Sequence, residues 1–346
     1  MIYIVDSFCI SPQPSHEGML REDSVVVMTG NKCKAIEPNY QGLIPNSLLR
    51  RMGKAVRMAV GSGLHLLKDQ EIHGIIVGTG NGGLEDCVKF LMQIIDWEEG
   101  RLTPTNFVQS TANASAGTLA LLSKNKHYNA THVHKGLSFD NALLDAQMRI
   151  EEGKGSRILV GGVEELSTYN FNIEWQRDRF KKEEETVDSN TLFDSKTKGA
   201  IAGEGSCFFI LSDQPTANAV QLEWTAQLNG TVPDISHWVK EVLATRNLAL
   251  EDIDAIIDGR NGDIDLNNLY QQFTSLFPAA NQYAYKHLTG EYPSSSAFAT
   301  WLGAQLLTGE IPASYQLKGG RKSVKNVLIY NSYLGRQHGL IFLSKP

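Results

Sequence analysis

Two short segments carry residues at spacings typical of cofactor-binding or catalytic turns. The first is GTGNGG, where Gly78, Gly80 and Gly83 follow the apolar run GIIV and satisfy the G-x-G-x-x-G pattern of dinucleotide-binding turns. Glu98 lies near the position of the acidic residue that would contact a ribose, but it belongs to the charged end of a predicted helix and follows no second strand. We interpret GTGNGG as a simple turn and keep a dinucleotide-binding oxidoreductase as an alternative.

The second segment is Gly136-Leu137-Ser138-Phe139-Asp140, which lies between a predicted strand and a predicted helix. It resembles a G-x-S-x-G nucleophile elbow in which Asp140 replaces the last glycine. A serine at such a turn could form an acyl-enzyme. Serine is also a favoured N-cap, because its hydroxyl accepts a backbone N–H of the first helical turn. We favour the N-cap for Ser138 and keep serine-dependent acyl transfer as an alternative.

The surrounding elements predict an α/β protein with buried sheets. Apolar runs rich in β-branched residues alternate with segments of helical period, such as IYIV followed by LLRRMGKAVRMAVGSGLHLL. Turn residues after Leu211 suggest two halves, 1–212 and 213–346. The first half contains an inserted loop at about 172–192, and the highly charged segment 179–190 is expected to be exposed there.

Composition excludes several classes of function. The 346 residues are 42% hydrophobic and 20% charged, and 32 basic against 38 acidic side chains give a formal charge of -6. This balance argues against an extended nucleic-acid surface. No apolar run reaches the roughly 20 residues that span a bilayer and no leader is recognisable, so we expect a cytoplasmic protein without membrane contact. The cysteines suit neither a metal site nor a disulfide framework and are expected as buried thiols: Cys9, Cys33, Cys87 and Cys207.

Four segments in order resemble motifs of the β-ketoacyl synthase family of the thiolase superfamily, and together they cover almost the whole chain. They are TPTNFVQSTANASAG at 103–117, the strand-turn-helix-strand unit at 129–165, FDSKTKGAIAGEGSCFFIL at 193–211, and YKHLTGEYPSSSAFATWLGAQLLTGEIPAS at 285–314. The third, with its Gly-Glu-Gly run, is the strongest match. The resemblance implies a thiolase-like fold of two pseudo-duplicated halves in a layered αβαβα architecture.

The resemblance also indicates where catalytic groups belong. In active members the turn before the helix of the second segment carries a cysteine, whose thiol is activated by the helix N-terminus; the matching residue here is Gly136. The two family histidines are replaced by Asp258 and Glu291, whereas Lys286 is retained. The C-terminal segment 331–339, NSYLGRQHG, has lost most glycines of the family's acyl gate.

Decarboxylative condensation needs a thiolate and two imidazoles, and none stands at its matched position. This pattern resembles chain length factors, which implies a non-catalytic subunit without cofactor or metal. Such subunits pair with an active ketosynthase in fatty acid, polyketide or aryl-polyene-type elongation. A homodimer is the other expected assembly. An active enzyme of the same fold that recruits Cys87 or Cys207 as its thiol is a further alternative.

The resemblance assigns roles to other residues. The strand Thr131–His134 and the loop around Phe107 would face the partner, with Phe107 as tunnel lining or as a plain core aromatic, and His132 and His134 as interface packing. Glu204, between glycines, is expected to accept several backbone N–H groups and to shape the site floor. The substrate, tunnel or interface candidates are Phe107, Ser138, Phe139 and Glu204. The candidates for docking an acyl carrier protein, or for a merely solvated helix face, are Arg50, Arg51, Lys54 and Arg57.

Overall fold

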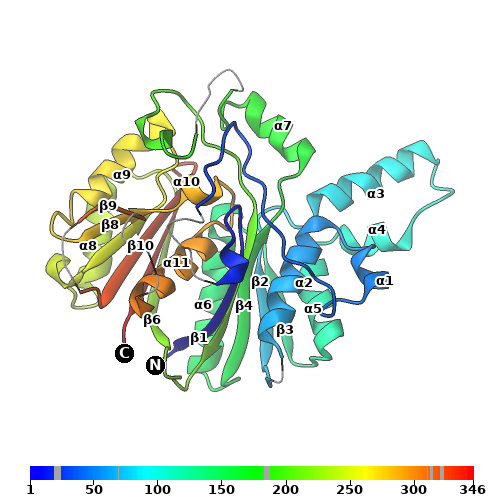
Figure 1. Cartoon of the computed structure of the whole chain (residues 1–346), viewed down its shortest axis with the longest axis horizontal. Helices are drawn as coiled ribbons and strands as arrows, with labels where there is room; N and C mark the ends of the chain where they lie inside the picture. The colour runs from blue at the N-terminus through cyan, green and yellow to red at the C-terminus, as the bar shows by residue number, and fades with distance from the viewer. Residues whose placement is uncertain (19–24, 69, 183–187, 310, 312–314, 320–322) are drawn as a thin grey trace.

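The computed structural model describes residues 1–18, 25–68, 70–182, 188–309, 311, 315–319 and 323–346. It forms one mixed sheet in the order β3-β2-β4-β5-β1-β6-β11-β10-β7-β8-β9 (Figure 1). The strands of the first half are β1 (Tyr3–Ile10), β2 (Gly74–Gly78), β3 (Tyr128–His132), β4 (Arg157–Glu164) and β5 (Gly205–Ser212). Those of the second are β6 (Val220–Asn229), β7 (Ala255–Asp258), β8 (Asn281–Ala284), β9 (Gln316–Lys318), β10 (Asn326–Tyr333) and β11 (Gln337–Ser344).

The two halves repeat the same strand scheme. In the first, β1 runs antiparallel to β5 and β5 antiparallel to β4, while β4, β2 and β3 are parallel. In the second, β6, β11, β10, β7 and β8 follow the same order and directions. A short antiparallel pairing of β1 with β6, at Tyr3 with Gln221 and Ile4 with Val220, joins the halves. The predicted α/β fold of two similar halves is confirmed; the boundary after residue 212 stays a prediction.

Helices form three layers around these strands. Between the halves lie α6 (Ser138–Glu151), which packs against β2, β4 and β6, and α11 (Ser296–Thr308), which packs against β1, β5, β10 and β11. On the outer face of the first half lie α2 (Lys54–Leu66) and α5 (Ala114–Ser123), and on that of the second α8 (Ile235–Ala244) and α9 (Asn267–Thr274). The remaining helices are α1 (Asn46–Leu49), α3 (Leu84–Asp96), α4 (Pro104–Gln109), α7 (Thr168–Gln176) and α10 (Lys286–Thr289).

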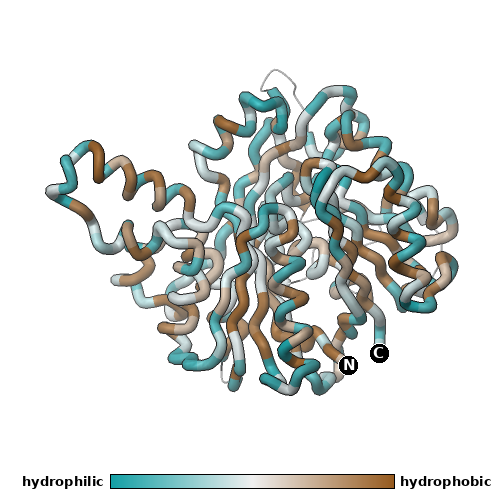
Figure 2. Tube along the Cα trace, turned by 180° about the vertical axis from the view of Figure 1, so that it is seen from behind, coloured by the Kyte–Doolittle hydropathy of each residue, from teal (hydrophilic) through white to brown (hydrophobic). Residues whose placement is uncertain are grey.

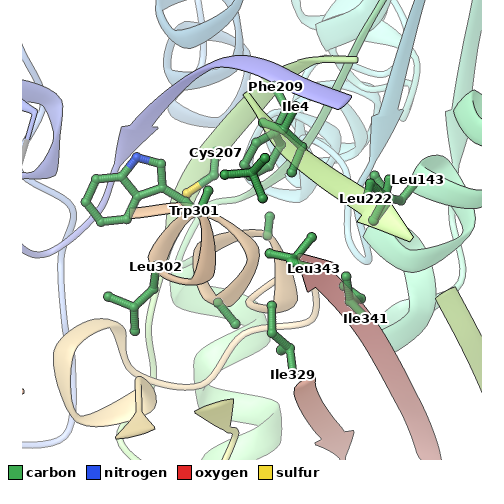
Figure 3. Close-up of a cluster of buried hydrophobic side chains, with 14 of the residues drawn as sticks. Ile4, Leu143, Cys207, Phe209, Leu222, Trp301, Leu302, Ile329, Ile341 and Leu343 are labelled. Atoms are coloured by element: carbon green, nitrogen blue, oxygen red, sulfur yellow. The ribbon is translucent and has the colours of Figure 1, made fainter. Parts of the chain in front are cut away.

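The main core lies where the two middle helices meet the strands of both halves. Figure 2 shows hydrophobic residues concentrated along the central strands, and Figure 3 shows Trp301 and Leu302 of α11 among side chains from β5 and β10. Because α11 is enclosed by strands of both halves, it has almost no polar face, and small and apolar residues alternate along it. This core fixes the starts of α6 and α11 beside each other.

Several local expectations were wrong. The helix predicted from Leu48 is broken into α1 and α2, since Gly53 ends the intervening turn and its N–H donates to Gln109 Oε1 (2.6 Å). In the charged segment 179–190, Lys181 and Ser189 are buried; residues 183–187 lie outside the described part. The Lys181 ammonium donates to Ser195 Oγ (2.8 Å), which draws this segment onto the body.

The cysteines also differ from the expectation of separate buried thiols. Cys9 and Cys207 are direct neighbours across the β1–β5 ladder and are joined by a disulfide. Cys33 is a buried free thiol whose pKa is raised to about 12 by burial and by the charge of Glu204. Cys87 is a half-buried residue of α3 and not a core residue. Cys207, one of the two cysteines proposed as a recruited thiol, is therefore not a free thiol.

No helix among the described residues has the length and apolar character required to cross a bilayer. Within the same residues, no three His, Cys, Asp or Glu side chains are grouped so that they could hold a metal ion.

We expect Phe209→Ala to lower the free energy of unfolding by about 3–5 kcal/mol, because it empties a fully buried site in the main core where the ring packs on Phe139. The control is Leu317→Ala on exposed β9, which should change it by less than about 0.5 kcal/mol. Chemical denaturation followed by circular dichroism measures both. Equal effects of the two substitutions would contradict this location of the core.

Candidate functional site

The position matched to the catalytic cysteine is closed by the opposite half of the chain. Gly136 lies in a short 3-10 turn, Lys135–Leu137, immediately before α6. A β-carbon added at Gly136 would overlap with Cβ and Cγ of Tyr333, far inside van der Waals contact. Because Cβ of Tyr333 is fixed to the backbone of β10, no change of rotamer removes this overlap. Any side chain at residue 136 therefore requires movement of the backbone.

The backbone amide at this position is also occupied. Gly136 N–H donates to Gln337 Oε1 (2.8 Å), and an N–H at a helix start is the kind of group that stabilises an oxyanion in acyl transfer. Tyr333 and Gln337 are partners at the end of the β10–β11 hairpin, whose turn contains Leu334 and Gly335 in left-handed conformations. The segment predicted as a degraded gate is thus a tight hairpin end that covers Gly136.

The first replaced histidine position carries a buried ion pair. Asp258, at the end of β7, is fully buried and accepts two parallel hydrogen bonds from Arg260, Nε to Oδ1 at 2.8 Å and Nη2 to Oδ2 at 2.6 Å. Burial opposes the charge of Arg260, but the hydrogen bonds and charge of Asp258 outweigh it and raise the pKa of the guanidinium. An acceptor already engaged by a guanidinium has no proton to give to a developing enolate or oxyanion.

The second replaced position forms another ion pair with the retained lysine. Lys286 Nζ lies 2.7 Å from Glu291 Oε2, and both side chains are buried. Asn261 Nδ2 donates to the same oxygen at 2.8 Å. Burial lowers the pKa of Lys286 against the opposing charge of Glu291. The charge of the lysine is therefore used inside the protein and is not directed at a substrate.

Little space remains between these groups. A partly open cavity, lined in part by Glu164, Asn261, Glu291, Tyr292 and Tyr333, has a volume of about 30 Å³. This volume is enough for about one water molecule and too small for an acyl chain. Glu291 Oε1 lies buried at this point and has no hydrogen-bond partner within the described part of the chain.

Ser138 does not act as the predicted N-cap. It is the first residue of α6 and is fully buried. Its hydroxyl bonds to residues that precede it in the chain: Oγ donates to Lys135 O (2.8 Å) and accepts from His134 N (2.8 Å). The hydroxyl closes the turn that precedes the helix. A buried hydroxyl with both bonds made to backbone is not placed for nucleophilic attack. Phe139 is also fully buried and packs on Phe209, 5.7 Å between ring centroids.

The dinucleotide alternative is wrong on geometry. The backbone N–H of Gly80 and the hydroxyl of Thr79 donate to Glu164 Oε1, and Asn81 Nδ2 donates to Glu164 Oε2. These are the groups that would bind a pyrophosphate in a glycine-rich turn, and a carboxylate of the protein occupies them. Burial raises the pKa of Glu164 to about 7, partly offset by these hydrogen bonds.

Glu204 shapes the floor beside the site. It accepts hydrogen bonds from the backbone N–H of Ala35 and of Leu166, both at 2.9 Å. It is buried and also forms an ion pair with Lys54. Gly203 next to it lies against the backbone of Thr289 and Gly290, so a β-carbon there would clash. Glu204 therefore ties segments from three parts of the chain together.

The basic cluster is smaller than the sequence suggested. Besides Lys54, Arg57 is engaged, with Nη2 2.6 Å from Glu37 Oε1. Arg50 and Arg51 are exposed in the turn between α1 and α2. The expectation of four basic side chains on one helix face is wrong, because Gly53 breaks the helix and two of the four cations pair with carboxylates.

One edge of the molecule combines an open strand with exposed apolar residues. Among the residues that the structure describes, β3 is the end strand of the sheet and pairs with β2 alone. Phe107 is 58% exposed on α4, 5.4 Å from the ring of Phe90, so the core alternative for Phe107 is wrong. His132 Nε2 lies 2.8 Å from Asp145 Oδ2. Other exposed apolar side chains along this edge are Val108, Leu121, Val133, Leu144 and Met148. An open edge of this kind indicates a protein interface.

Sequence matching identified residues 136, 258 and 291 as substituted positions. Each of the three makes hydrogen bonds to other residues of the protein. The closing residues Tyr333 and Gln337 were not identified from the sequence, although the altered 331–339 segment gave a signal. Glu164, which ends β4 within the matched segment 129–165, was not identified from the sequence either.

We expect Lys286→Met to lower the free energy of unfolding by about 3–5 kcal/mol, because it leaves the buried Glu291 carboxylate without its cation. The double variant Lys286→Met/Glu291→Leu removes both charges and should recover most of this loss. Denaturant titration of the two variants and the wild type measures the difference. A double variant as unstable as Lys286→Met would show that the pair is not coupled in this way.

Comparison with known proteins gives a partial family match and a shared fold. Residues 31–175 match the family described as Beta-ketoacyl synthase, N-terminal domain. No curated protein matches the sequence.

Among solved structures, the chain is similar to a ketosynthase in complex with its chain length factor from Xenorhabdus doucetiae, with TM-score 0.78, 16% identity, and coverage of 100% of this chain and 98% of that chain. The ishigamide ketosynthase/chain length factor gives TM-score 0.80, 15% identity and coverage of 100% and 99%. A beta-ketoacyl synthase from Burkholderia phymatum STM815 gives TM-score 0.78, 16% identity and coverage of 100% and 99%. Residues 31–175 therefore match the N-terminal domain model of the β-ketoacyl synthases, and the whole chain shares its fold with these ketosynthase structures.

Proposed function

We propose that this chain is a non-catalytic subunit of the chain length factor type, which pairs with an active ketosynthase during acyl chain elongation. The observation that carries the proposal is the closure of residue 136 by Tyr333. A condensing enzyme needs a thiolate at that point and free donors around it. Here the side-chain space, the backbone amide and both histidine positions are used for internal contacts.

The open edge of the sheet is the surface where we expect the partner to bind. Unpaired N–H and C=O groups along an end strand favour pairing with another chain, and β3 is such a strand. The similar structures include complexes of a ketosynthase with its chain length factor and a type II PKS acyl-carrier protein in complex with its ketosynthase. These likenesses support a mixed dimer of two similar folds for this chain, with an identical copy as the other candidate partner.

Two further roles belong to the proposal. Phe107 is an exposed aromatic on the side of the open edge, which suits a side chain that reaches the partner's acyl channel. Arg50 and Arg51 are the two exposed cations of the basic cluster, and they would meet an acidic acyl carrier protein. The product pathway could be of the fatty acid, polyketide or aryl-polyene type, and we expect it to operate in the cytoplasm.

We expect Gly136→Cys to destabilise the protein by about 1–3 kcal/mol, because the new β-carbon overlaps with Tyr333. Tyr333→Gly serves as the single control, and Gly136→Cys/Tyr333→Gly should be more stable than the two separate losses predict. A double-mutant cycle in denaturant measures this coupling. If Gly136→Cys is as stable as the wild type, the position is open to a nucleophile and the proposal loses its main support.

We expect co-expression with the intact ketosynthase encoded nearest to this chain to give a mixed dimer by native mass spectrometry. Val133→Glu, at the exposed residue that directly follows β3, should weaken that dimer about tenfold or more because it buries a charge in the interface. Leu317→Glu, an exposed leucine on β9, is the matched control. A stable homodimer that excludes the ketosynthase would contradict the proposal.

A further inference from the structure

Two neighbouring carboxylates line the partly open cavity beside the closed site. Glu164 ends β4 and Glu165 directly follows it, and both are buried. Among the described residues neither forms an ion pair. Each accepts hydrogen bonds from uncharged groups, which are Thr79, Gly80 and Asn81 for Glu164 and the backbone N–H of Ala55 and Glu85 for Glu165. Burial raises the pKa of both carboxyl groups to about 7. A buried carboxylate is normally paired with a cation, so both groups favour a positive charge in the cavity.

Glu291 adds a third acceptor to the same cavity. Its Oε2 accepts from Lys286 Nζ (2.7 Å) and from Asn261 Nδ2 (2.8 Å). Its Oε1 is buried and has no hydrogen-bond partner within the described part of the chain. The residue is only 5% exposed, and buried polar atoms nearly always have a hydrogen-bond partner. Oε1 is therefore an acceptor for a donor that enters the cavity.

The remaining charges of the lining are also mainly negative. Glu174 and Asp263 contribute two further carboxylates, and Arg179 contributes a guanidinium. That guanidinium is already paired, with Nη1 2.5 Å from Glu174 Oε2. The charge of Lys135 acts on Glu164, but its side chain is exposed and its ammonium donates to Asn81 Oδ1 (2.6 Å). This excess of carboxylates repels an anionic ligand and attracts a cation.

The shape of the cavity indicates the kind of cation. A volume of about 30 Å³ accepts one group of the size of water, which is also the size of an ammonium group. Within the described residues no three acidic, histidine or cysteine side chains are grouped to hold a metal ion. An ammonium group instead donates separate N–H groups to separate acceptors. The rings of Tyr292 and Tyr333 line the cavity and favour a cation.

An apolar wall completes the cavity. Leu166, Phe180 and Leu266 belong to its lining, and ligand sites in proteins combine such apolar walls with a few convergent polar groups. A short alkyl chain attached to the ammonium group would contact this wall.

We propose that the cavity binds a primary alkylammonium ion, whose ammonium group donates to Glu291 Oε1 beside Glu164 and whose alkyl chain lies on the apolar wall. The site belongs to this chain alone. Its test therefore needs no partner subunit and is independent of the proposed function.

The test titrates n-butylammonium chloride into the purified chain at constant ionic strength and measures heat by isothermal titration calorimetry. Saturable binding is expected for the wild type. Glu291→Gln and Glu164→Gln should each raise the dissociation constant about tenfold or more, because each removes a charged acceptor. The matched control is Glu37→Gln, which removes a carboxylate that pairs with Arg57 and does not line the cavity, and it should leave binding unchanged.

Circular dichroism verifies that the variants are folded. Glu164→Gln leaves the pair of Lys286 and Glu291 intact, so it keeps the test decisive if Glu291→Gln does not fold. Tetramethylammonium chloride, which has no N–H and is wider than the cavity, should not bind, and neither should sodium chloride. A lysine amide acetylated at its α-amino group should bind more tightly than n-butylammonium if the source of the ammonium group is a protein side chain, and more weakly if it is a free amine.

Three results would overturn the proposal. The first is the absence of saturable binding of n-butylammonium to the wild type. The second is equal binding of tetramethylammonium, which would show that N–H donation is not recognised. The third is wild-type affinity in folded Glu291→Gln and Glu164→Gln, which would place the ligand elsewhere on the protein.

Discussion

A β-carbon at residue 136 and the side chain of Tyr333 cannot occupy the same space, and the rest of the site depends on this constraint. The two residues come from opposite halves of the chain and meet where α6 begins. With glycine at 136, the end of the β10–β11 hairpin approaches closely enough for Gln337 to accept the backbone N–H. The two halves are thereby joined directly at the point where a condensing enzyme keeps a space for its substrate.

The buried charges near this contact are also stabilised by partners within the protein. Removing an ion from water is costly unless a partner of opposite charge and further hydrogen bonds replace the water. Asp258 has Arg260, and Glu291 has Lys286 and Asn261. The carboxylates at 258 and 291, the positions that sequence matching assigned to family histidines, are stabilised here because each has a cation beside it. These contacts form a buried hydrogen-bond network, which supports the proposed non-catalytic role.

The fold could be predicted from the sequence because the alternation of apolar runs and helical segments is a local signal. The order of the matched motifs also extends over both halves. It identified Gly136, Asp258 and Glu291 as substituted positions for the same reason. It could not identify Tyr333 as the closing residue, since that contact joins positions 197 apart in number (333 minus 136). Exposure of Phe107, burial of Lys181 and the backward bonds of Ser138 also depend on packing between distant segments. Gly53 was a local sign of the break before α2. It was missed because the apolar residues on both sides of it follow a helical period.

In the proposed complex the partner ketosynthase carries out the reaction, and this chain has a structural role. The most direct measurement is the intact mass of the purified wild-type chain after incubation with acyl- and malonyl-carrier proteins, alone and in the mixed dimer. The account predicts acyl adducts on the ketosynthase and none on this chain under either condition. An acyl adduct mapped to this chain, at Ser138, at a cysteine or at any other residue, would contradict the claim that its site is closed.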